Sequence, residues 1–399
     1  MSIRQIQKRI REKPLQQILH NYPCIGSGLE NIKDVSAGIQ IRTGEVLRTI
    51  LMGPLFSSTS LLETDVFSHT SIARKLEIRA CSDSLMEERL HERVVSHLRE
   101  TCYSLYSKAK ERGIFNFLLN NGSKDYVRLL RIDGTYLMTH FFVMGVVSGK
   151  VRNFLDCELA ASKGKEIPAA KELLKRIDHN LGYGAFDIAS FDGLFFSYDM
   201  FELVKGEMGT DFLIRIKSDD KRHLEAKEEA ERIMREFPKD VERAKGIDPT
   251  GEYEYEAVRV KDIKLAQCRF PLSVTRITYR KLKGQDKGKE RTTYNVTSAN
   301  YLSLEDIVRI SLSHWDVEQY FDQLKNDFYS RHSYMKDQEA ALNLALLLGI
   351  SYNVLMLYEW EVLMVDGMDK EYLRSLKLTC RILRRLIVEA LIGGPQALD

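Results

Sequence analysis

The spacing of hydrophobic residues divides the chain into helical and strand-rich segments. In residues 1–120, hydrophobic residues recur every three or four positions, which is the period of an amphipathic helix. The clearest example is the series Leu90, Val94, Leu98, Cys102 and Leu105. We therefore predict a helical N-terminal region over 1–120. Within it, residues 21–44 are rich in Gly, Ser and Pro, so we expect irregular structure there.

Short apolar runs replace the helical period in residues 121–217. Such runs are typical of buried strands. Strands are predicted over 126–133, 137–147, 153–161, 186–192 and 211–217, with helices over 168–181 and 197–208. Three consecutive strands can pair as an antiparallel meander, whereas strands that follow a helical crossover add in parallel. The predicted fold class is therefore α/β, with a mixed sheet and helices on its faces.

Residues 218–302 begin with a charged helix and then alternate between apolar and polar positions. Thr275, Ile277 and Tyr279 point one way, and Arg276, Thr278 and Arg280 point the other way. This period of two indicates strands. We interpret 218–302 as a β-rich insertion that separates the first part of the core, 121–217, from a second part over 303–365.

Two apolar helices are predicted near the C-terminus. Residues 340–358 could span a membrane by composition, but they include Asn343, Ser351 and Asn353, so we favour a buried core helix. Residues 366–399 are predicted to form a helical tail. Its hydrophobic seam over 373–390 could dimerise or pack on the chain's own core, and we favour the core.

Composition limits the function classes. The chain has 399 residues, 44% of them hydrophobic and 29% charged, with a formal net charge of +2. This is the balance of a globular protein with a real core and not of a polycation. A nucleic-acid surface must therefore come from local clusters of basic residues.

Two basic clusters stand out. The densest contains Arg276, Arg280, Lys281, Lys283, Lys287, Lys289 and Arg291. It fits either a surface that follows a phosphate backbone or a solubilising loop. The second, over 8–13, is a candidate for holding DNA ends.

The cysteines and the N-terminus indicate the compartment. Six cysteines are scattered without a C-x-x-C pair, so we expect a reducing compartment rather than a disulfide framework. The first residues are polar and lack the apolar stretch of a signal peptide. Neither a phosphate-binding G-x-x-x-x-G-K-[ST] loop nor a dinucleotide-binding glycine motif is present, so nucleotide-driven chemistry has no support.

A helix predicted around Glu318 carries candidate chemistry. Ile310, Val317, Phe321, Leu324 and Phe328 form its apolar stripe. His314, Glu318 and Lys325 lie together on the flank of that stripe, where they could face a cleft. They could equally be solvated charges on an amphipathic helix.

Two further acids, Asp133 and Asp192, each follow an apolar run and precede a glycine. Asp-Gly is also a favoured turn pair, so each could simply mark a turn. Asp187 is a rival to Asp192, but it lies inside the predicted strand rather than at its end, where ligands gather. Taken together, Asp133, Asp192 and Glu318 suit two Mg²⁺ or Mn²⁺ ions, which can drive in-line displacement at phosphorus.

At this point the sequence resembles the DDE transposases of bacterial insertion sequences. The blocks around Ile132–Thr135 and from Phe191 to Lys217 are similar to the first- and second-aspartate blocks of that family. Residues 307–328 resemble the third block of the insertion-sequence-four group, whose signature is Tyr, Arg, Glu, Lys. Glu318 and Lys325 match its last two positions, whereas Ser311 and His314 stand where the signature has Tyr and Arg.

The resemblance implies an RNase H-like core, split by a β-rich insertion. Asp133, Asp192 and Glu318 would be the catalytic residues and hold two Mg²⁺ or Mn²⁺ ions. The candidates for contacting DNA are Lys325, His314, Ser311, Arg215, Arg276, Arg280, Lys281 and Lys283.

The implied reaction is cleavage at the transposon ends, followed by strand transfer of the 3′-hydroxyl into target DNA. The implied partners are the terminal inverted repeats, the target DNA and a second copy of the chain in a homodimer. The implied location is the bacterial cytosol, associated with the nucleoid. Two alternatives stay open: a nuclease of the same fold without strand transfer, and a catalytically silent DNA-binding protein derived from a transposase.

Overall fold

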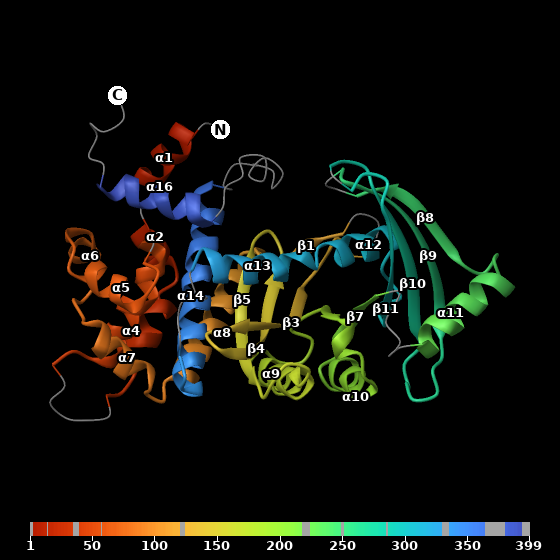
Figure 1. The fold of residues 1–399 in the computed structure, drawn as a ribbon, viewed down its shortest axis with the longest axis horizontal. Coiled ribbons are helices and arrows are strands. Elements are labelled where there is room, and N and C mark those ends of the chain that lie inside the picture. Colours follow the sequence, from red (N-terminus) through yellow and green to blue (C-terminus); the bar gives the residue numbers. More distant parts are fainter. Residues whose placement is uncertain are drawn as a thin grey trace.

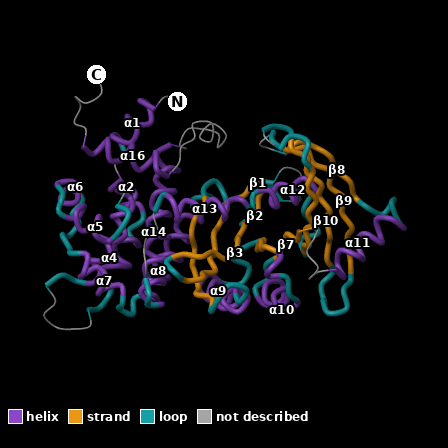
Figure 2. The backbone as a smooth tube through the Cα atoms, in the orientation of Figure 1, coloured by secondary structure: helices purple, strands orange, loops and turns teal. Residues whose placement is uncertain are grey.

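The protein is described here from a computed structural model. It describes residues 3–13, 15–34, 40–56, 58–119, 124–217, 224–248, 251–284, 286–328, 335–363 and 380–392. In Figures 1 and 2, N-terminal helices gather at one end, strands occupy the middle, and a second group of strands forms the other end. The prediction of a mixed α/β architecture is confirmed.

The first 111 residues contain helices and no strands within their described part. The elements are α1 (Ile3–Glu12), α2 (Leu15–Asn21), α3 (Cys24–Glu30), α4 (Thr43–Met52), the 3₁₀ turn η1 (Gly53–Phe56), α5 (Leu61–Ser68), α6 (Ser71–Lys75), α7 (Asp83–Leu90) and α8 (Val95–Glu111). The expectation of irregular structure over 21–44 was wrong for α3. There, Ile25 and Leu29 lie four residues apart and both are buried, so packing outweighs the low helix propensity of the two glycines.

A nine-stranded mixed sheet forms the rest of the framework. Its order is β5-β4-β3-β6-β7-β11-β10-β9-β8, and a separate pair, β1 (Phe117–Leu118) and β2 (Tyr126–Val127), lies beside it. The strands are β3 (Leu129–Leu137), β4 (His140–Ser148), β5 (Arg152–Ala160), β6 (Ile188–Asp192), β7 (Asp211–Lys217), β8 (Glu242–Ile247), β9 (Tyr253–Ile263), β10 (Leu272–Lys281) and β11 (Glu290–Thr297).

Strand directions follow from the connections. β3, β4 and β5 pair antiparallel as a meander, whereas β6 and β7 add in parallel to β3 and to each other. The crossovers are α9 (Glu166–Leu181) before β6, and η2 (Gly193–Phe195), α10 (Tyr198–Phe201) and the π-helical turn η3 (Glu202–Glu207) before β7. This is the predicted combination of a meander and parallel additions.

Strands β8–β11 extend the same sheet from the edge of β7. β11 pairs antiparallel with β7, so the strands of the predicted insertion join the main sheet rather than forming a separate one. The predicted alternation in β10 is confirmed, because Thr275, Ile277 and Tyr279 are buried while Arg276, Thr278 and Arg280 are not. Helix α11 (Leu224–Glu236) packs on β9 and β10, and α12 (Leu304–Leu312) packs on β8 and β9. The domain boundaries remain predictions.

Helix α14 (Gln338–Leu363) runs between the N-terminal helices and β5. It is long and apolar enough to cross a membrane, but its most apolar stretch is fully buried inside the protein. The prediction of a core helix is therefore confirmed. At Gly349, an added Cβ would lie 2.1 Å from Cδ1 of Phe154, so only glycine lets the helix approach β5 this closely.

The last described helix, α16 (Cys380–Ile392), packs on α1, η1 and α14. In the predicted seam, Cys380, Leu383 and Ile387 are buried in this packing. Leu373 and Leu376 lie outside the described residues. The described half of the seam thus supports packing on the chain's own core.

Candidate active site

Asp133 and Asp192 lie side by side on neighbouring parallel strands. The β3–β6 ladder pairs Leu129 with Ile188 and continues to Ile132 with Phe191. The next positions in that register are Asp133 and Asp192, and neighbouring strands are about 5 Å apart. This register is consistent with the prediction that Asp133 and Asp192 belong to one site.

The prediction that the first strand ends at Asp133 was wrong. β3 continues to Leu137, because Asp133 and Gly134 still pair with Met144 and Val143 of β4. The chain turns four residues later, at Met138 and Thr139, where φ is 49° and 70°. Asp133-Gly134 is therefore part of a strand and not a turn, which removes the simpler explanation of this acid.

The two aspartates share the sheet face that α12 and α13 (Trp315–Asn326) cover. Side chains alternate along a strand, so Asp133 shares its face with Leu129, which packs with Ile307 and Ile310 of α12. Helix α13 packs on β3. The prediction of a single helix from Ile310 to Phe328 was wrong. The structure interrupts it at Ser313 and His314, and Glu318 lies one turn into α13.

Burial and the neighbouring acids together raise the pKa of Asp133 from 3.8 to about 7. Burial is the largest cause. The hydrogen bond from the Gly134 N–H opposes the rise, and the charges of Asp192, Glu318 and Glu166 add to it. Carboxylates that share a site raise one another's pKa in this way. Asp192 and Glu318 therefore both lie close enough to Asp133 to act on it electrostatically.

Each aspartate uses one oxygen on the glycine that follows it. Oδ1 of Asp133 accepts from the Gly134 N–H at 2.7 Å, and Oδ1 of Asp192 accepts from the Gly193 N–H at 2.6 Å. These bonds fix the direction of the two side chains in the same way. Glu318, by contrast, has an exposed side chain on a helix.

Asp187, the rival of Asp192, has a different environment. Its Oδ2 accepts from the backbone N–H and Nε of Arg128 at 2.9 and 2.8 Å, and its Oδ1 accepts from Nζ of Lys124 at 2.9 Å. Burial alone would raise the pKa of Asp187, but these bonds outweigh it and hold the pKa at about 2. Asp187 is thus engaged in a local ion-pair network, which favours Asp192 as the second acid of the site.

Two polar groups near Asp133 escaped the sequence analysis. Oε2 of Glu166 and Oγ1 of Thr135 are buried and have no hydrogen-bond partner within the described part of the chain. Cγ of Glu166 lies 3.2 Å from where a Cβ on Gly134 would stand. No sequence signal marks Glu166, because a glutamate in the first turn of a helix is ordinary.

The donor set suits a hard divalent cation. The three carboxylates of Asp133, Asp192 and Glu318 offer oxygen donors, which are the ligand chemistry of Mg²⁺ or Mn²⁺. Among the described residues, however, no three His, Cys, Asp or Glu side chains are grouped so that they could hold a metal ion. The acids are therefore neighbours that do not form a closed set of ligands.

Ser311 and His314, two of the candidates for contacting DNA, are not on the surface. Ser311 is 2% exposed and His314 is 4% exposed, and Ser311 lies against the Tyr279 hydroxyl of β10. Neither side chain can touch DNA in this conformation. Ser311 lies in α12 and His314 in the break before α13, so neither is on the helix that carries Glu318.

Other candidates for contacting DNA lie closer to solvent. Lys325 is on α13, with Nζ 6.0 Å from the centre of the Phe321 ring. Arg215 is the register partner of Asp192 on β7. It therefore stands beside the acids on the same strand edge.

The basic stretch of β10 and its hairpin is partly neutralised. Nη1 of Arg276 contacts both carboxylate oxygens of Glu231 at 2.9 Å, and Nε of Arg280 donates to Glu254 at 3.0 Å. Lys281 lies 4.0 Å from Asp286, and Lys283 is exposed. Ion pairs on these arginines reduce the charge that the strand itself offers to DNA.

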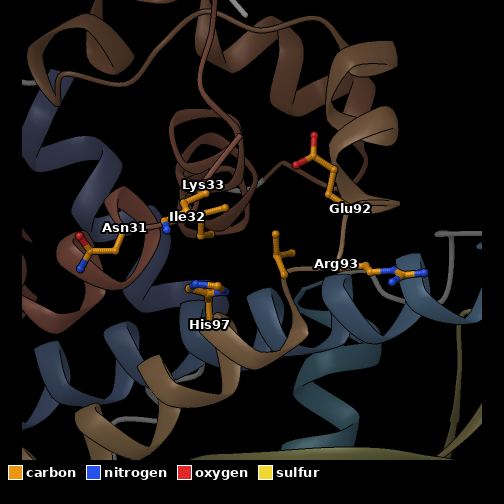
Figure 3. Close-up of a pocket in the computed structure, with 7 residues that line it drawn as sticks. Asn31, Ile32, Lys33, Glu92, Arg93 and His97 are labelled. Atoms are coloured by element: carbon orange, nitrogen blue, oxygen red, sulfur yellow. The ribbon is translucent and has the colours of Figure 1, made fainter. Parts of the chain in front are cut away.

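A separate pocket of about 340 Å³ lies among the N-terminal helices. It is lined by Asn31, Ile32, Lys33, Glu92, Arg93, Val94 and His97. Figure 3 shows that the labelled side chains come from the segment after α3, the segment before α8 and the first turn of α8. None of the candidate acids lines it.

Comparison with known proteins identifies the family. A search of the curated proteins finds no match. The family model for the transposase DDE domain matches residues 142–354, more than half of the chain. The match includes Asp192 and Glu318 and begins after Asp133. The chain therefore belongs to the DDE transposase family and is the transposase of a mobile element.

Proposed function

We propose that this transposase cuts the ends of its element and joins the freed 3′-hydroxyl to target DNA, using Asp133, Asp192 and Glu318 as catalytic residues. Transposases of this family act on DNA and generally use divalent metal ions. The observation that carries the proposal is that Asp192 and Glu318 both add to the raised pKa of Asp133, of which burial is the largest cause.

The proposed site has a clear electrostatic logic. Three carboxylates that repel one another are strained without a cation, and a bound cation relieves this repulsion. Two Mg²⁺ or Mn²⁺ ions would supply an activated water or 3′-hydroxyl and stabilise the leaving oxygen. Asp133 and Asp192 would hold them from the sheet, and Glu318 would close the site from α13.

Lys325 would bind a phosphate of the processed end. It lies seven residues after Glu318 on α13, which is about 10 Å along a helix and on nearly the same side. That separation lets the lysine contact the backbone while Glu318 faces the scissile phosphate. Arg215, beside Asp192 on β7, could hold the other side of the same strand.

We infer that strands β3–β7 and α9 form an RNase H-like core and that the segment over 218–302 is an insertion in it. The support is the order β5-β4-β3-β6-β7 with its antiparallel and then parallel pairings. The exposed lysines of the β10–β11 hairpin and α1 would contact terminal repeats or target DNA. Pairing two ends would require a homodimer, and we expect the protein in the bacterial cytosol with the nucleoid.

The test is cleavage of a plasmid that carries the DNA flanking the coding region on both sides. Wild-type protein with Mg²⁺ should cut at the element ends and join them to a second plasmid. Asp133→Asn, Asp192→Asn and Glu318→Gln should each abolish cutting. Asp199→Asn, which alters an exposed acid on α10, is the matched control and should leave it intact. Metal-dependent cutting that survives all three active-site variants would contradict the assignment.

Two observations favour a second candidate, a silent DNA-binding transposase. Ser311 and His314 are buried, and the described acids do not form a closed ligand set. This candidate requires sequence-specific binding of the end DNA by the wild type without cutting in Mg²⁺ or Mn²⁺. The same plasmid assay, combined with a gel-shift measurement, separates the two.

A further inference from the structure

A buried cation lies on the face of the sheet that carries the acids. Arg131 of β3 is 0% exposed. It comes two residues before Asp133, so its side chain leaves the same face of the strand. Ser190, its register partner on β6, comes two residues before Asp192. Arg131 and Ser190 thus form the layer of side chains next to the two aspartates.

The guanidinium of Arg131 connects three strands to the break before α13. Nε donates to Oγ of Ser148 in β4 at 2.9 Å, and Nη1 donates to Oγ of Ser190 at 3.3 Å. Nη2 donates to the carbonyl oxygen of Ile310 at 3.3 Å and also to Oγ of Ser313. Ser313 in turn donates to Ile310 at 3.0 Å. The two helix-side contacts bridge 179 and 182 residues of sequence.

We propose that Arg131 is a positioning residue that sets Glu318 relative to Asp133 and Asp192. This inference rests on the proposed function of the three acids. Ser313 begins the break, and Glu318 lies five residues farther on, in the first turn of α13. Because only His314 separates Ser313 from α13, a shift at Ser313 is passed to the turn that carries Glu318.

An arginine suits this task better than another buried side chain. Its planar fork presents five N–H donors in fixed directions, so it can hold strands and helix at once. A lysine offers one flexible ammonium and cannot reproduce that geometry. A hydrophobic side chain would avoid the cost of burying a charge, but it would lose the bonds to Ile310 and Ser313.

The test compares the Mn²⁺ affinity, the affinity for end DNA and the melting temperature of matched variants. Mn²⁺ binding is followed by electron paramagnetic resonance on the full chain with end DNA. Arg131→Met should weaken Mn²⁺ binding about tenfold, as expected when the support of metal ligands is lost, and leave DNA affinity unchanged. Arg131→Lys should recover part of the loss. Excess Mn²⁺ should restore cutting by Arg131→Met but not by Glu318→Gln.

Arg259→Met is the matched control. Arg259 is 3% exposed and donates to Glu242 and to the carbonyl oxygen of Leu302, so it is a second buried arginine on the sheet, in β9. Its loss should lower the melting temperature without changing Mn²⁺ affinity. Equal weakening of Mn²⁺ binding in Arg259→Met would show general destabilisation and overturn the inference.

Further variants and outcomes separate the role of Arg131 from a folding failure and from the proposed function. If Arg131→Met does not fold, Ser313→Ala removes the side-chain contact between Arg131 and the break before α13 and leaves the contact with the Ile310 carbonyl; wild-type Mn²⁺ affinity in that variant would overturn the inference. Mn²⁺ binding that is lost in Asp133→Asn but unchanged in a folded Arg131→Met would refute the role of Arg131 and leave the proposed function standing. Absence of Mn²⁺ binding in the wild type would refute both.

Discussion

Replacing Asp133 should stabilise the protein while it abolishes activity. In the folded state, burial and the acids Asp192, Glu318 and Glu166 raise the pKa of Asp133 from 3.8 to about 7. The native state therefore binds a proton between these values that the unfolded chain has released. The associated stability is greatest at low pH and is lost as pH rises from 3.8 through 7.

The magnitude follows from the shift. One pKa unit corresponds to about 1.4 kcal/mol, so the full penalty on the charged form is about 4 kcal/mol at most. Between pH 5 and pH 8, about 2–3 kcal/mol of this penalty develops. Asparagine carries no charge and can still accept from the Gly134 N–H. The difference in unfolding free energy between Asp133→Asn and the wild type should thus grow by about 2–3 kcal/mol in favour of the variant between pH 5 and pH 8.

The assay is urea unfolding of both proteins at pH 5 and pH 8 with a chelator present. Asp187→Asn is the control with the opposite sign. The pKa of Asp187 is held at about 2, so removing this carboxylate should destabilise the folded protein by about 2 kcal/mol at both pH values. A stability difference between Asp133→Asn and wild type that does not grow with pH would refute the reasoning. Added Mg²⁺ at pH 8 should stabilise the wild type and Asp187→Asn but not Asp133→Asn.

Three further predictions concern the metal, the core and the DNA contact. Because a cation displaces the proton of Asp133, Mn²⁺ affinity should rise about tenfold from pH 6 to pH 8, and equal affinities in titrations at the two pH values would contradict this. Gly349→Ala should cost about 1–3 kcal/mol of unfolding free energy, since its Cβ would meet Phe154 at 2.1 Å. Gly26→Ala, whose Cβ has no neighbour nearer than 3.9 Å, should instead stabilise α3 by up to about 1 kcal/mol in the same urea assay. Lys325→Gln should weaken binding of end DNA in gel shifts and leave Mn²⁺ affinity unchanged, and a loss of Mn²⁺ affinity would show that Lys325 supports the metal site instead.

Much of the sheet could be predicted, because the spacing of apolar residues locates the strands and the type of connection between strands determines how they pair. The meander followed by helical crossovers could be predicted from apolar runs alone, and strand 211–217 was located to the residue. The parallel crossovers then account for Asp133 and Asp192 standing in one register. How the strands of 218–302 attach to β7 could not be predicted, because period-two patterns do not specify which edge a strand joins.

The errors arose where tertiary contacts override local preference. Asp-Gly favours turns, yet the ladder with β4 keeps Asp133 and Gly134 in a strand. The hydrophobic stripe from Ile310 to Phe328 continues across Ser313 and His314, so it concealed the break that buries Ser311 and His314. Arg131 and Glu166 could not be found from sequence, since their significance depends on contacts with residues far along the chain.

Anomalous scattering from Mn²⁺-soaked crystals of the protein bound to an end DNA tests the central claim most directly. The account predicts two Mn²⁺ peaks about 3.5–4 Å apart, enclosed by the carboxylates of Asp133, Asp192 and Glu318. Peaks held by other residues, or a Glu318 carboxylate that stays out of reach of any bound Mn²⁺, would contradict it.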